Sequence, residues 1–308
     1  MDVEPGLAGQ RIDNYLLRPL KGVPKSYVSR ILRKGEVRVN TGRVKAVYRL
    51  KAGDRVRIPP VRLPATETPV APSKPVCERL EHAIVYEDDR FMVLNKPSGL
   101  AVHGGSGVSY GVIEAMRSLR PGDRELELVH RLDRETSGCL LISKRRSALR
   151  ILHELMRQNR VDKRYLALLA GSWRKGSRVV DLPLRKNTLQ GGERVVRVDA
   201  EGKPAETRFH RVQRFRKATL VEVELITGRT HQIRVHSAWI GSPVLGDQKY
   251  GEDSANRWAK SLGLNRLFLH ANSLSLHWPG EKRPIEITAP LPEELEEVLK
   301  RLKKENEV

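Results

Sequence analysis

The chain is short of cysteine, of acidic residues and of long apolar runs. Its 308 residues include two cysteines, Cys77 and Cys139, which lie far apart and form no C-x-x-C pair. A disulfide framework and a zinc knuckle therefore have no support, and a reducing compartment fits better. No stretch approaches the roughly 20 apolar residues that a membrane span needs, and the segment 1–7 is acidic and short of apolar residues. We expect a soluble, cytoplasmic protein with no membrane partner.

The deficit of acidic residues gives the chain a strong positive charge. Against 57 Lys and Arg there are 37 Asp and Glu, a net charge of +20 with a pI near 10.2. Such an excess favours a polyanionic partner such as nucleic acid, although dispersed positive charge can also serve solubility alone. Residues 1–60 hold 14 basic residues against 5 acidic ones, a net +9. We therefore predict a small basic module over residues 1–60.

A proline-rich segment separates this module from the rest. Six prolines lie between Pro59 and Pro75, counting both, a composition that sustains neither helix nor central strand. We predict a linker over 61–79 and a larger domain over 80–308. Apolar runs typical of strands of one sheet occur at 84–86, 91–94, 139–142, 165–170, 220–226 and 267–269. Helical periodicity at 148–158 and 292–304 makes the fold class α+β, without the regular strand–helix alternation of a doubly wound fold.

Within the basic module, the pattern predicts an amphipathic helix over 25–34, which Pro24 can open and Gly35 can close. Apolar residues fall on one arc, and the opposite arc is polar without any anion. A charged helix face is commonly only solvated, but the lack of anions favours contact with phosphates. Alternating segments at 37–39 and 55–58 add further basic side chains. The residues that we assign to RNA binding are Lys25, Arg30, Arg33, Lys34 and Arg38.

Two dense polar clusters stand beside predicted strands of the larger domain. Residues 130–138 read H-R-L-D-R-E-T-S-G and directly precede the apolar run at 139–142. Residues 227–236 read T-G-R-T-H-Q-I-R-V-H, and the sequence can continue as a helix over 231–240. Taken alone, the first cluster is explained equally well as a charged surface turn with Asp133 paired to a neighbouring Arg. The second cluster favours a functional site.

Together these clusters resemble the paired signatures of the RluA-type pseudouridine synthases. The match extends through 95–99, 163–167 and 245–247, and covers essentially residues 80–290. The segment 11–58 resembles the S4 RNA-binding domain. The resemblance implies a pseudouridine synthase fold, with a mainly antiparallel central sheet flanked by helices and a small S4-like domain. It also implies isomerisation of specific uridines in 23S (large-subunit) ribosomal RNA, although a transfer RNA substrate stays open.

The family resemblance implies roles for three residues in the reaction. Asp133 would be the catalytic carboxylate, which can attack the ribose, attack the base or remove a sugar proton. Burial raises the pKa of a carboxyl group, so a nearby cation is needed to keep it ionised, and the resemblance assigns Arg229 to this ion pair. Tyr165 would stack on the uracil or take part in proton transfer, and a packed core aromatic is the alternative. Atoms are conserved in the isomerisation, so no cofactor is required.

The remaining expectations concern RNA contacts, metals and partners. The target base must leave its stack, and Arg131 would fill the vacated space or contact a phosphate, with His130 as a further RNA contact. The histidines 130, 231, 236, 270 and 277 form no H-E-x-x-H motif, so we expect hydrogen-bonded structural histidines and no metal. The partner would be 23S RNA or a large-subunit assembly intermediate, bound by a monomer. The rival functions are a non-catalytic assembly protein and a methyltransferase, whose glycine-rich cofactor loop we do not find.

Overall fold

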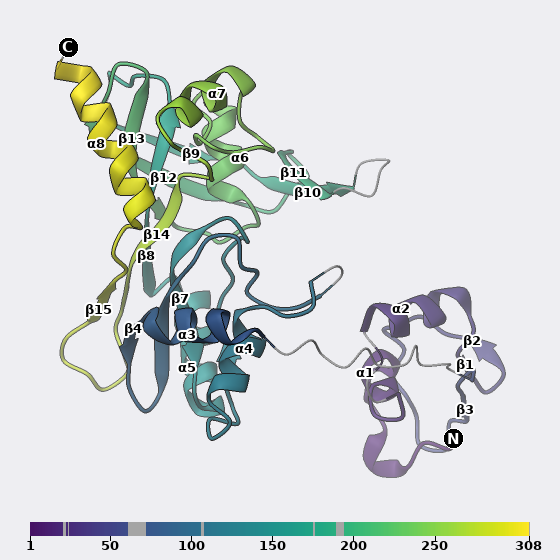
Figure 1. Cartoon of the computed structure of the whole chain (residues 1–308). Helices are drawn as coiled ribbons and strands as arrows, with labels where there is room; N and C mark the ends of the chain where they lie inside the picture. Colours follow the sequence, from purple (N-terminus) through teal and green to yellow (C-terminus); the bar gives the residue numbers. More distant parts are fainter. Residues whose placement is uncertain are drawn as a thin grey trace. The chain divides into compact units, whose positions relative to one another are not determined.

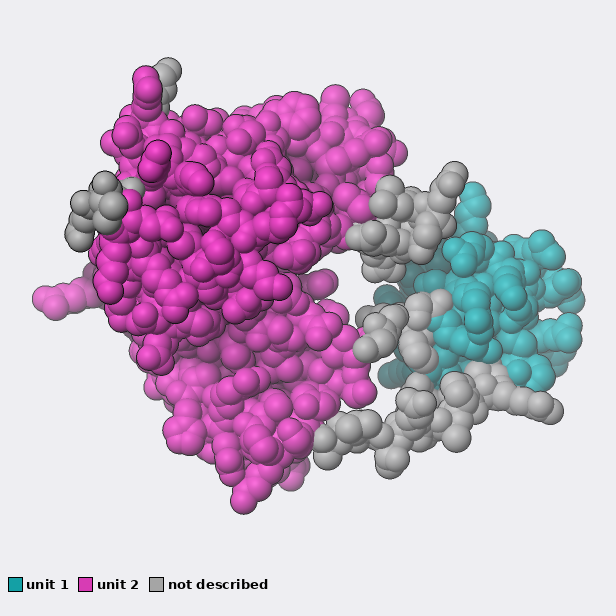
Figure 2. Space-filling view, turned by 45° about the horizontal axis from the view of Figure 1, so that its top comes forward, with its two compact units in different colours: residues 1–70 teal, residues 71–308 magenta. Residues whose placement is uncertain are grey.

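A computed structural model describes residues 1–20, 23, 25–60, 72–105, 108–174, 176–188 and 194–307. The chain divides into two compact units, residues 1–70 and 71–308, which Figure 2 colours separately. Each unit encloses a hydrophobic core of its own. Within the described ranges, no helix is both long enough and apolar enough to cross a membrane.

The first unit packs short helices against a small sheet. Its helix α2 spans Lys25–Lys34, the range predicted from the sequence, and is followed by Gly35, which has a positive φ of 72°. Val28, Ile31 and Leu32 of α2 are buried in the core of this unit. The other elements are α1 (Ile12–Leu16) and the antiparallel strands β1 (Arg38–Val39), β2 (Gly42–Arg43) and β3 (Val56–Arg57). Pro24 lies outside the described residues.

The second unit is built on one large, mainly antiparallel sheet (Figure 1). Its strands follow the order β4-β5-β7-β14-β8-β13-β12-β9, with β15 beside β14 and β6 beside β7. The bounds are β4 (Ile84–Glu87), β5 (Phe91–Lys96), β6 (Glu127–Leu128), β7 (Ser137–Ser143), β8 (Val161–Ala170), β9 (Ser177–Asp181), β12 (Glu206–Arg214), β13 (Ala218–Leu225), β14 (Leu269–Leu276) and β15 (Ile285–Thr288). Five of the six apolar runs identified in the sequence fall largely within strands of this sheet, and the run at 267–269 reaches β14 only at Leu269. The mixture of this sheet with helices agrees with the predicted α+β class.

Helices pack against the two halves of this sheet (Figure 1). Their bounds are α3 (Lys74–His82), α4 (Val112–Leu119), α5 (Arg146–Arg157), α6 (Gln232–Trp239), α7 (Asp253–Ser261) and α8 (Glu293–Glu307). Leu152 and Leu155 of α5 join the main core, whereas Leu295 and Leu302 of α8 pack in another cluster with Phe268. Helices from different parts of the unit therefore contribute to its buried interior.

The predicted linker is too long at its C-terminal end. Residues 74–79 belong to α3. Pro75 is compatible with this helix because it occupies the first turn, where a missing N–H group costs no hydrogen bond. Leu80 of the same helix is fully buried. Residues 61–71, which make up most of the predicted linker, lie outside the described ranges.

A separate hairpin joins β10 (Leu184–Thr188) to β11 (Arg194–Val198). Figure 1 shows it extending from the part of the unit that carries α6. Its base packs in a small apolar cluster that contains Leu184, Val196 and Val235. Because Val235 belongs to α6, this cluster fixes the hairpin to the helix that contains part of the second polar motif.

The junction of β7 and β14 anchors the end of the first polar motif. These two strands are parallel, with Ser137 opposite His270 and Gly138 opposite Ala271. Gly138 has a φ of 106°, and a Cβ atom at this position would lie 2.2 Å from the carbonyl oxygen of Ala271. Only glycine allows so close an approach of two backbones. The motif is thus tied directly to the strand that neighbours β8.

Candidate active site

A cavity of about 560 Å³ lies where the two polar motifs meet. Its walls come mainly from the loop before β7, from the segment between β13 and α6, and from β8. The predicted site residues of this unit all line it, and they are His130, Arg131, Asp133, Tyr165 and Arg229. A smaller cavity of about 240 Å³ shares Arg131 and Asp133 with it. The fold therefore gathers into one site residues that are far apart in the sequence.

Asp133 lies close to two groups of the second motif. Its side chain is 27% exposed, and its Oδ2 atom lies 3.7 Å from Nη1 of Arg234. The same oxygen lies 3.9 Å from Nε2 of His231. A guanidinium group at this distance favours the ionised form of a carboxyl group. The site thus supplies the charge compensation that we expected for Asp133, but the arginine is a different one.

The predicted ion pair between Asp133 and Arg229 is wrong. Nε of Arg229 donates to the carbonyl oxygen of Pro204 at 2.9 Å, and its backbone N–H donates to the side chain of Gln232. Arg229 precedes α6 and is exposed, although it lines the cavity, whereas Arg234 lies within the helix and approaches the carboxylate. Both arginines belong to one motif, so the sequence pattern did not distinguish them.

A second carboxylate fixes Arg234 in place. Nε and Nη2 of Arg234 donate to the two oxygens of Asp247 at 2.6 and 2.7 Å, and both side chains are buried. Burial alone would raise the pKa of Asp247, but the hydrogen bonds and charge of Arg234 hold it below its usual value. Burial would also lower the pKa of Arg234, but the bonds to Asp247 raise it. We therefore regard the two groups as a permanent ion pair that orients Nη1 toward Asp133.

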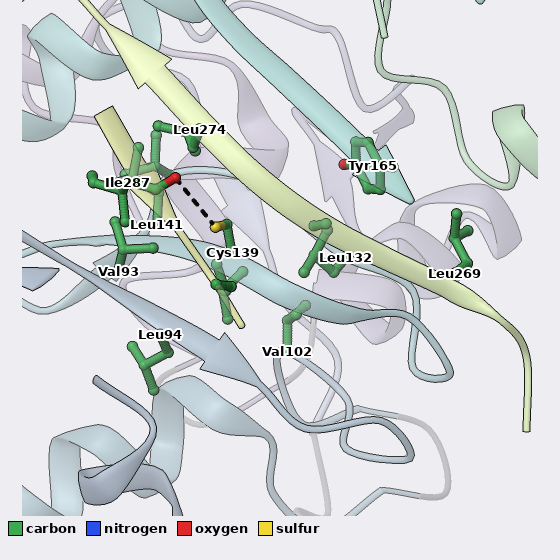
Figure 3. Close-up of a cluster of buried hydrophobic side chains, with 14 of the residues drawn as sticks. Val93, Leu94, Val102, Leu132, Cys139, Leu141, Tyr165, Leu269, Leu274 and Ile287 are labelled. Carbon is green, nitrogen blue, oxygen red and sulfur yellow. Dashed lines mark hydrogen bonds between the residues drawn. The ribbon is translucent and has the colours of Figure 1, made fainter. Parts of the chain in front are cut away.

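Tyr165 occupies the middle of the sheet and reaches the cavity. It lies on β8 between Val223 of β13 and Ala271 of β14, and it is 7% exposed. Figure 3 shows its ring within the hydrophobic cluster that also holds Leu132 and Leu269. Burial and then the charge of Asp133 raise the pKa of the Tyr165 hydroxyl above its usual value. The phenol is therefore protonated at neutral pH, and its ring serves both the core and the cavity wall.

A buried lysine supports the loop that carries Asp133. Nζ of Lys96 donates to the carbonyl oxygens of Pro97, Leu100 and Arg134, at 2.9, 2.8 and 3.1 Å. Burial lowers the pKa of Lys96 to about 7, yet these three acceptors match the three N–H groups of the charged form. Lys96 itself is fully buried. The loop conformation therefore depends on a side chain that lines neither of the two cavities that contain Asp133.

The histidines of this unit are mostly hydrogen-bonded, as expected. The backbone N–H of Leu141 donates to Nε2 of the half-buried His130, and loss of water around the ring lowers the pKa of His130 to about 4. His236 and His270 are buried and hydrogen-bonded, whereas His277 is exposed. A neutral ring bonded to the backbone gives His130 a structural role and offers no support for an RNA contact.

Arg131 lies at the rim that the two cavities share. Its side chain is exposed, and within the described ranges its guanidinium forms no hydrogen bond or ion pair. A cation without a protein partner can meet an RNA phosphate or stack on a base. The position is thus consistent with the predicted RNA contact.

Cys139 behaves as a small core residue. It is 2% exposed, and its Sγ atom lies 3.9 Å from the carbonyl oxygen of Ile287, the contact drawn in Figure 3. Burial raises the pKa of the Cys139 thiol to about 11. Since the thiolate is the reactive form of cysteine, a nucleophilic role has no support.

The basic residues assigned to RNA in the first unit lie on its surface. Arg30, Arg33 and Lys34 are exposed on α2, opposite the buried face of this helix. The guanidinium of Arg30 lies 4.4 Å from the ring centre of Tyr27, and Nη1 of Arg38 donates to the carbonyl oxygen of Thr41. The side chain of Lys25 lies outside the described residues. The exposed cations form a surface suited to the phosphates of RNA.

Comparison with known families agrees with this arrangement of fold and site. A model of the RNA pseudouridylate synthase family matches residues 90–239, and a model of the S4 domain matches residues 10–56. The human protein RNA pseudouridylate synthase domain containing 4 superposes with a TM-score of 0.62 at 28% identity, over 74% of this chain and 95% of its own. The chain belongs to the RNA pseudouridylate synthase family, and it is an enzyme that isomerises uridine in RNA.

Two bacterial relatives match over nearly the whole chain, and both are named ribosomal large subunit pseudouridine synthase C. The protein of Pasteurella multocida (strain Pm70) is 55% identical over 299 residues, which cover 97% of this chain and 92% of the relative. The protein of Escherichia coli (strain K12) is also 55% identical over 299 residues, with 96% and 94% covered. The similarity therefore spans both compact units.

Proposed function

We propose that this enzyme converts specific uridines of 23S ribosomal RNA to pseudouridine, with Asp133 as its catalytic carboxylate. The observation that carries the proposal is the position of Asp133 in a cavity wall, with Arg234 at ion-pair distance. The choice of large-subunit RNA is supported by the names of the relatives that match 96–97% of the chain. The protein would act as a cytoplasmic monomer on 23S RNA or on a large-subunit assembly intermediate.

In the reaction, the N1–C1′ glycosidic bond of uridine breaks, the base turns, and carbon 5 bonds to C1′. Nitrogen 1 gains a proton and carbon 5 loses one, so no atoms are added overall. Asp133 would act in the bond-breaking half, as a nucleophile or as a base, and Arg234 would keep it ionised. Tyr165 would present its ring to the uracil and its protonated hydroxyl to the base. Each role concerns a group that lines the cavity.

The target uridine would reach this cavity by base flipping. A base stacked in a helix is inaccessible to a recessed carboxylate, so the nucleotide must rotate out of its stack. Arg131 is exposed at the rim of both cavities, and its side chain would occupy the vacated space. The exposed cations of α2, Arg30, Arg33 and Lys34, would hold other phosphates of the same RNA. Single-stranded loops and bulges are the segments of RNA that permit this access.

The decisive experiment uses Asp133→Asn, which keeps the shape of the side chain and removes its charge. The substrate is transcribed 23S RNA that carries tritium on carbon 5 of uridine, and tritium release reports isomerisation. We expect no release by Asp133→Asn, with RNA affinity close to that of the unaltered protein in a filter-binding assay. The matched control is Asp253→Asn, because Asp253 is an exposed aspartate that lines neither cavity.

Two results would contradict the proposal. Full tritium release by Asp133→Asn would refute the role of this carboxylate. Release from transfer RNA but not from 23S RNA would refute the proposed substrate while leaving the reaction intact. Mapping pseudouridines in ribosomal RNA from cells that lack the protein would then identify the target positions.

A further inference from the structure

His231 has an unusual backbone conformation next to Asp133. It is the N-cap residue of α6, with φ 54° and ψ 18°, in the left-handed region. A non-glycine residue in this region is strained and persists only where its surroundings hold it, and such residues cluster at functional sites. Glycine or asparagine would occupy the position with less strain. The presence of histidine is therefore best explained by its imidazole ring.

The ring of His231 is held by Tyr250. Nδ1 of His231 lies 2.8 Å from the Tyr250 hydroxyl, and the two rings meet edge to face with centroids 5.5 Å apart. The same hydroxyl accepts the backbone N–H of Val196, a residue of β11, at 3.0 Å. Tyr250 is thus placed between the histidine and the β10–β11 hairpin.

The contacts of the Tyr250 hydroxyl favour one of the two neutral tautomers of His231. Among the described residues, Nδ1 is the acceptor available to the Tyr250 proton, because Val196 N–H can only donate. When Nδ1 accepts, the proton of the neutral ring sits on Nε2, the nitrogen that lies 3.9 Å from Oδ2 of Asp133. Burial lowers the pKa of His231 although the charge of Asp133 opposes the shift, which favours the neutral ring. The protonated nitrogen of the ring is therefore the one nearer to the carboxylate, at a distance longer than a hydrogen bond.

One short segment, residues 247–250, anchors both groups that approach Asp133. Asp247 binds two nitrogens of Arg234, and Tyr250 binds His231. The Arg234 guanidinium also lies 5.1 Å from the ring centre of Tyr250, and the backbone N–H of Tyr250 donates to Asp247. The environment of Asp133 thus depends on two residues, Asp247 and Tyr250, that do not line the larger cavity.

We propose that His231 and Tyr250 are positioning residues for Asp133. The tyrosine hydroxyl fixes the histidine tautomer, and the resulting Nε2–H group orients the carboxylate and stabilises its ionised form. Through Val196, the same contacts link the carboxylate to the β10–β11 hairpin. The inference rests on the proposed catalytic role of Asp133, which it extends to a residue behind the cavity wall.

The test removes each contact separately and measures tritium release from transcribed 23S RNA. Tyr250→Phe deletes only the hydroxyl, and its matched control is Tyr86→Phe, which deletes a hydroxyl that donates to Asp88. We expect Tyr250→Phe to lower kcat about tenfold, because the neutral His231 ring is then free to carry its proton on Nδ1, with unchanged RNA affinity. The control should retain full activity.

Two variants of His231 distinguish the effect of its ring from the effect of its backbone conformation. Asparagine adopts the left-handed conformation readily but cannot reach Asp133 from the Nε2 position. Glutamine can place an amide N–H near that position. We expect His231→Asn to lose about tenfold to a hundredfold in kcat, and His231→Gln to recover part of this loss. A purely structural role would give the opposite order, because asparagine relieves the backbone strain.

The pH profile of kcat/KM is a measurement that a loss of stability alone would not change. The charged and titratable groups that face the His231 ring are Asp133, Arg234, Asp247, Lys249 and Tyr250. Without the Nε2–H donor the ionised carboxylate takes up a proton more readily. The acid limb of kcat/KM should therefore move to higher pH in Tyr250→Phe and His231→Asn.

Three outcomes decide between the two proposals. An unchanged acid limb in both Tyr250→Phe and His231→Asn would overturn the inference. If Asp133→Asn is inactive while these two variants match the unaltered enzyme, the inference fails and the proposed function stands. An active Asp133→Asn refutes the proposed function itself.

Discussion

Nη1 of Arg234 lies 3.7 Å from Oδ2 of Asp133 while its other two nitrogens bind Asp247. One guanidinium thus lies between two carboxylates, one buried and one in the cavity wall. The buried carboxylate fixes the arginine, and the arginine compensates the charge of the more exposed one. This division of roles explains why one arginine of the second motif matters more to Asp133 than the other.

We predict that Arg234→Gln and Arg229→Gln have very different effects. Arg234→Gln leaves the carboxylate of Asp247 buried without its cation, so the free energy of unfolding should fall by about 3–5 kcal/mol. Tritium release should be abolished as well. Arg229→Gln alters an exposed side chain bonded to Pro204, and should change stability by less than about 0.5 kcal/mol. Urea denaturation of both variants tests this, and equal losses of stability would contradict our assignment of the two arginines.

We predict that Tyr165→Phe distinguishes the role of the Tyr165 ring from the role of its hydroxyl. No described residue forms a hydrogen bond with this hydroxyl, so its removal leaves no buried donor or acceptor unpaired. The melting temperature should therefore stay close to that of the unaltered protein, whereas kcat should fall about a hundredfold through loss of proton transfer. Single-turnover tritium release measures the effect. Undiminished kcat in Tyr165→Phe, with loss only in Tyr165→Leu, would show that the ring alone contributes.

Stability should fall as the pH drops from about 6.5 to 4. Loss of water around the rings lowers the pKa of both His130 and His270 from 6.5 to about 4. In this interval the unfolded chain binds more protons than the folded one, so acidification favours unfolding by up to roughly 3 kcal/mol for each histidine. Urea denaturation at pH 7.5 and pH 5 measures the difference. Replacing the exposed His277 by Gln should leave it unchanged, and equal stability at both pH values would contradict the prediction.

The basic face of α2 should set the salt dependence of RNA binding rather than the rate of the reaction. Arg30 and Arg33 are exposed there, and each phosphate contact contributes about 0.7–0.9 to the slope of log K against log salt. The double variant Arg30→Gln, Arg33→Gln should therefore reduce this slope by about 1.5, with kcat unchanged at saturating RNA. Filter binding over a series of salt concentrations measures the slope. The control is Arg283→Gln, an exposed arginine that lines neither cavity, and an equal change in that variant would contradict the role of α2.

Elements with a strong local pattern could be predicted from the sequence. Helix α2 agrees with the predicted range because its apolar spacing and Gly35 act within a few residues. The strands β9 and β12 were missed because we sought continuous apolar runs. In β12 the buried Thr207 and Phe209 alternate with partly exposed polar residues such as Arg208. Two-residue alternation would have identified this strand.

The sequence predicted which residues line the site better than it predicted the contacts between them. The motifs placed Asp133 and Tyr165 in one cavity, because the family resemblance extends over both segments. The choice between Arg229 and Arg234 depended on Asp247, which holds Arg234 and lies 13 residues beyond it. Tyr250 was likewise missed, although the L-G-D motif at 245–247 marked the adjacent segment. Contacts between a helix and a segment beyond its end are not determined by a local pattern.

The close approach of Gly138 to Ala271 has a consequence for mutational surveys of this enzyme. A saturation library at position 138 should lose every substitution, because any side chain there would push β7 away from β14. Variants at position 138 would be depleted from the library as strongly as variants of a residue that contacts the substrate. Gly138 nevertheless lines neither cavity beside Asp133. Intolerance at the end of H-R-L-D-R-E-T-S-G thus reflects the space between two strands, and should not be counted as evidence of contact with RNA.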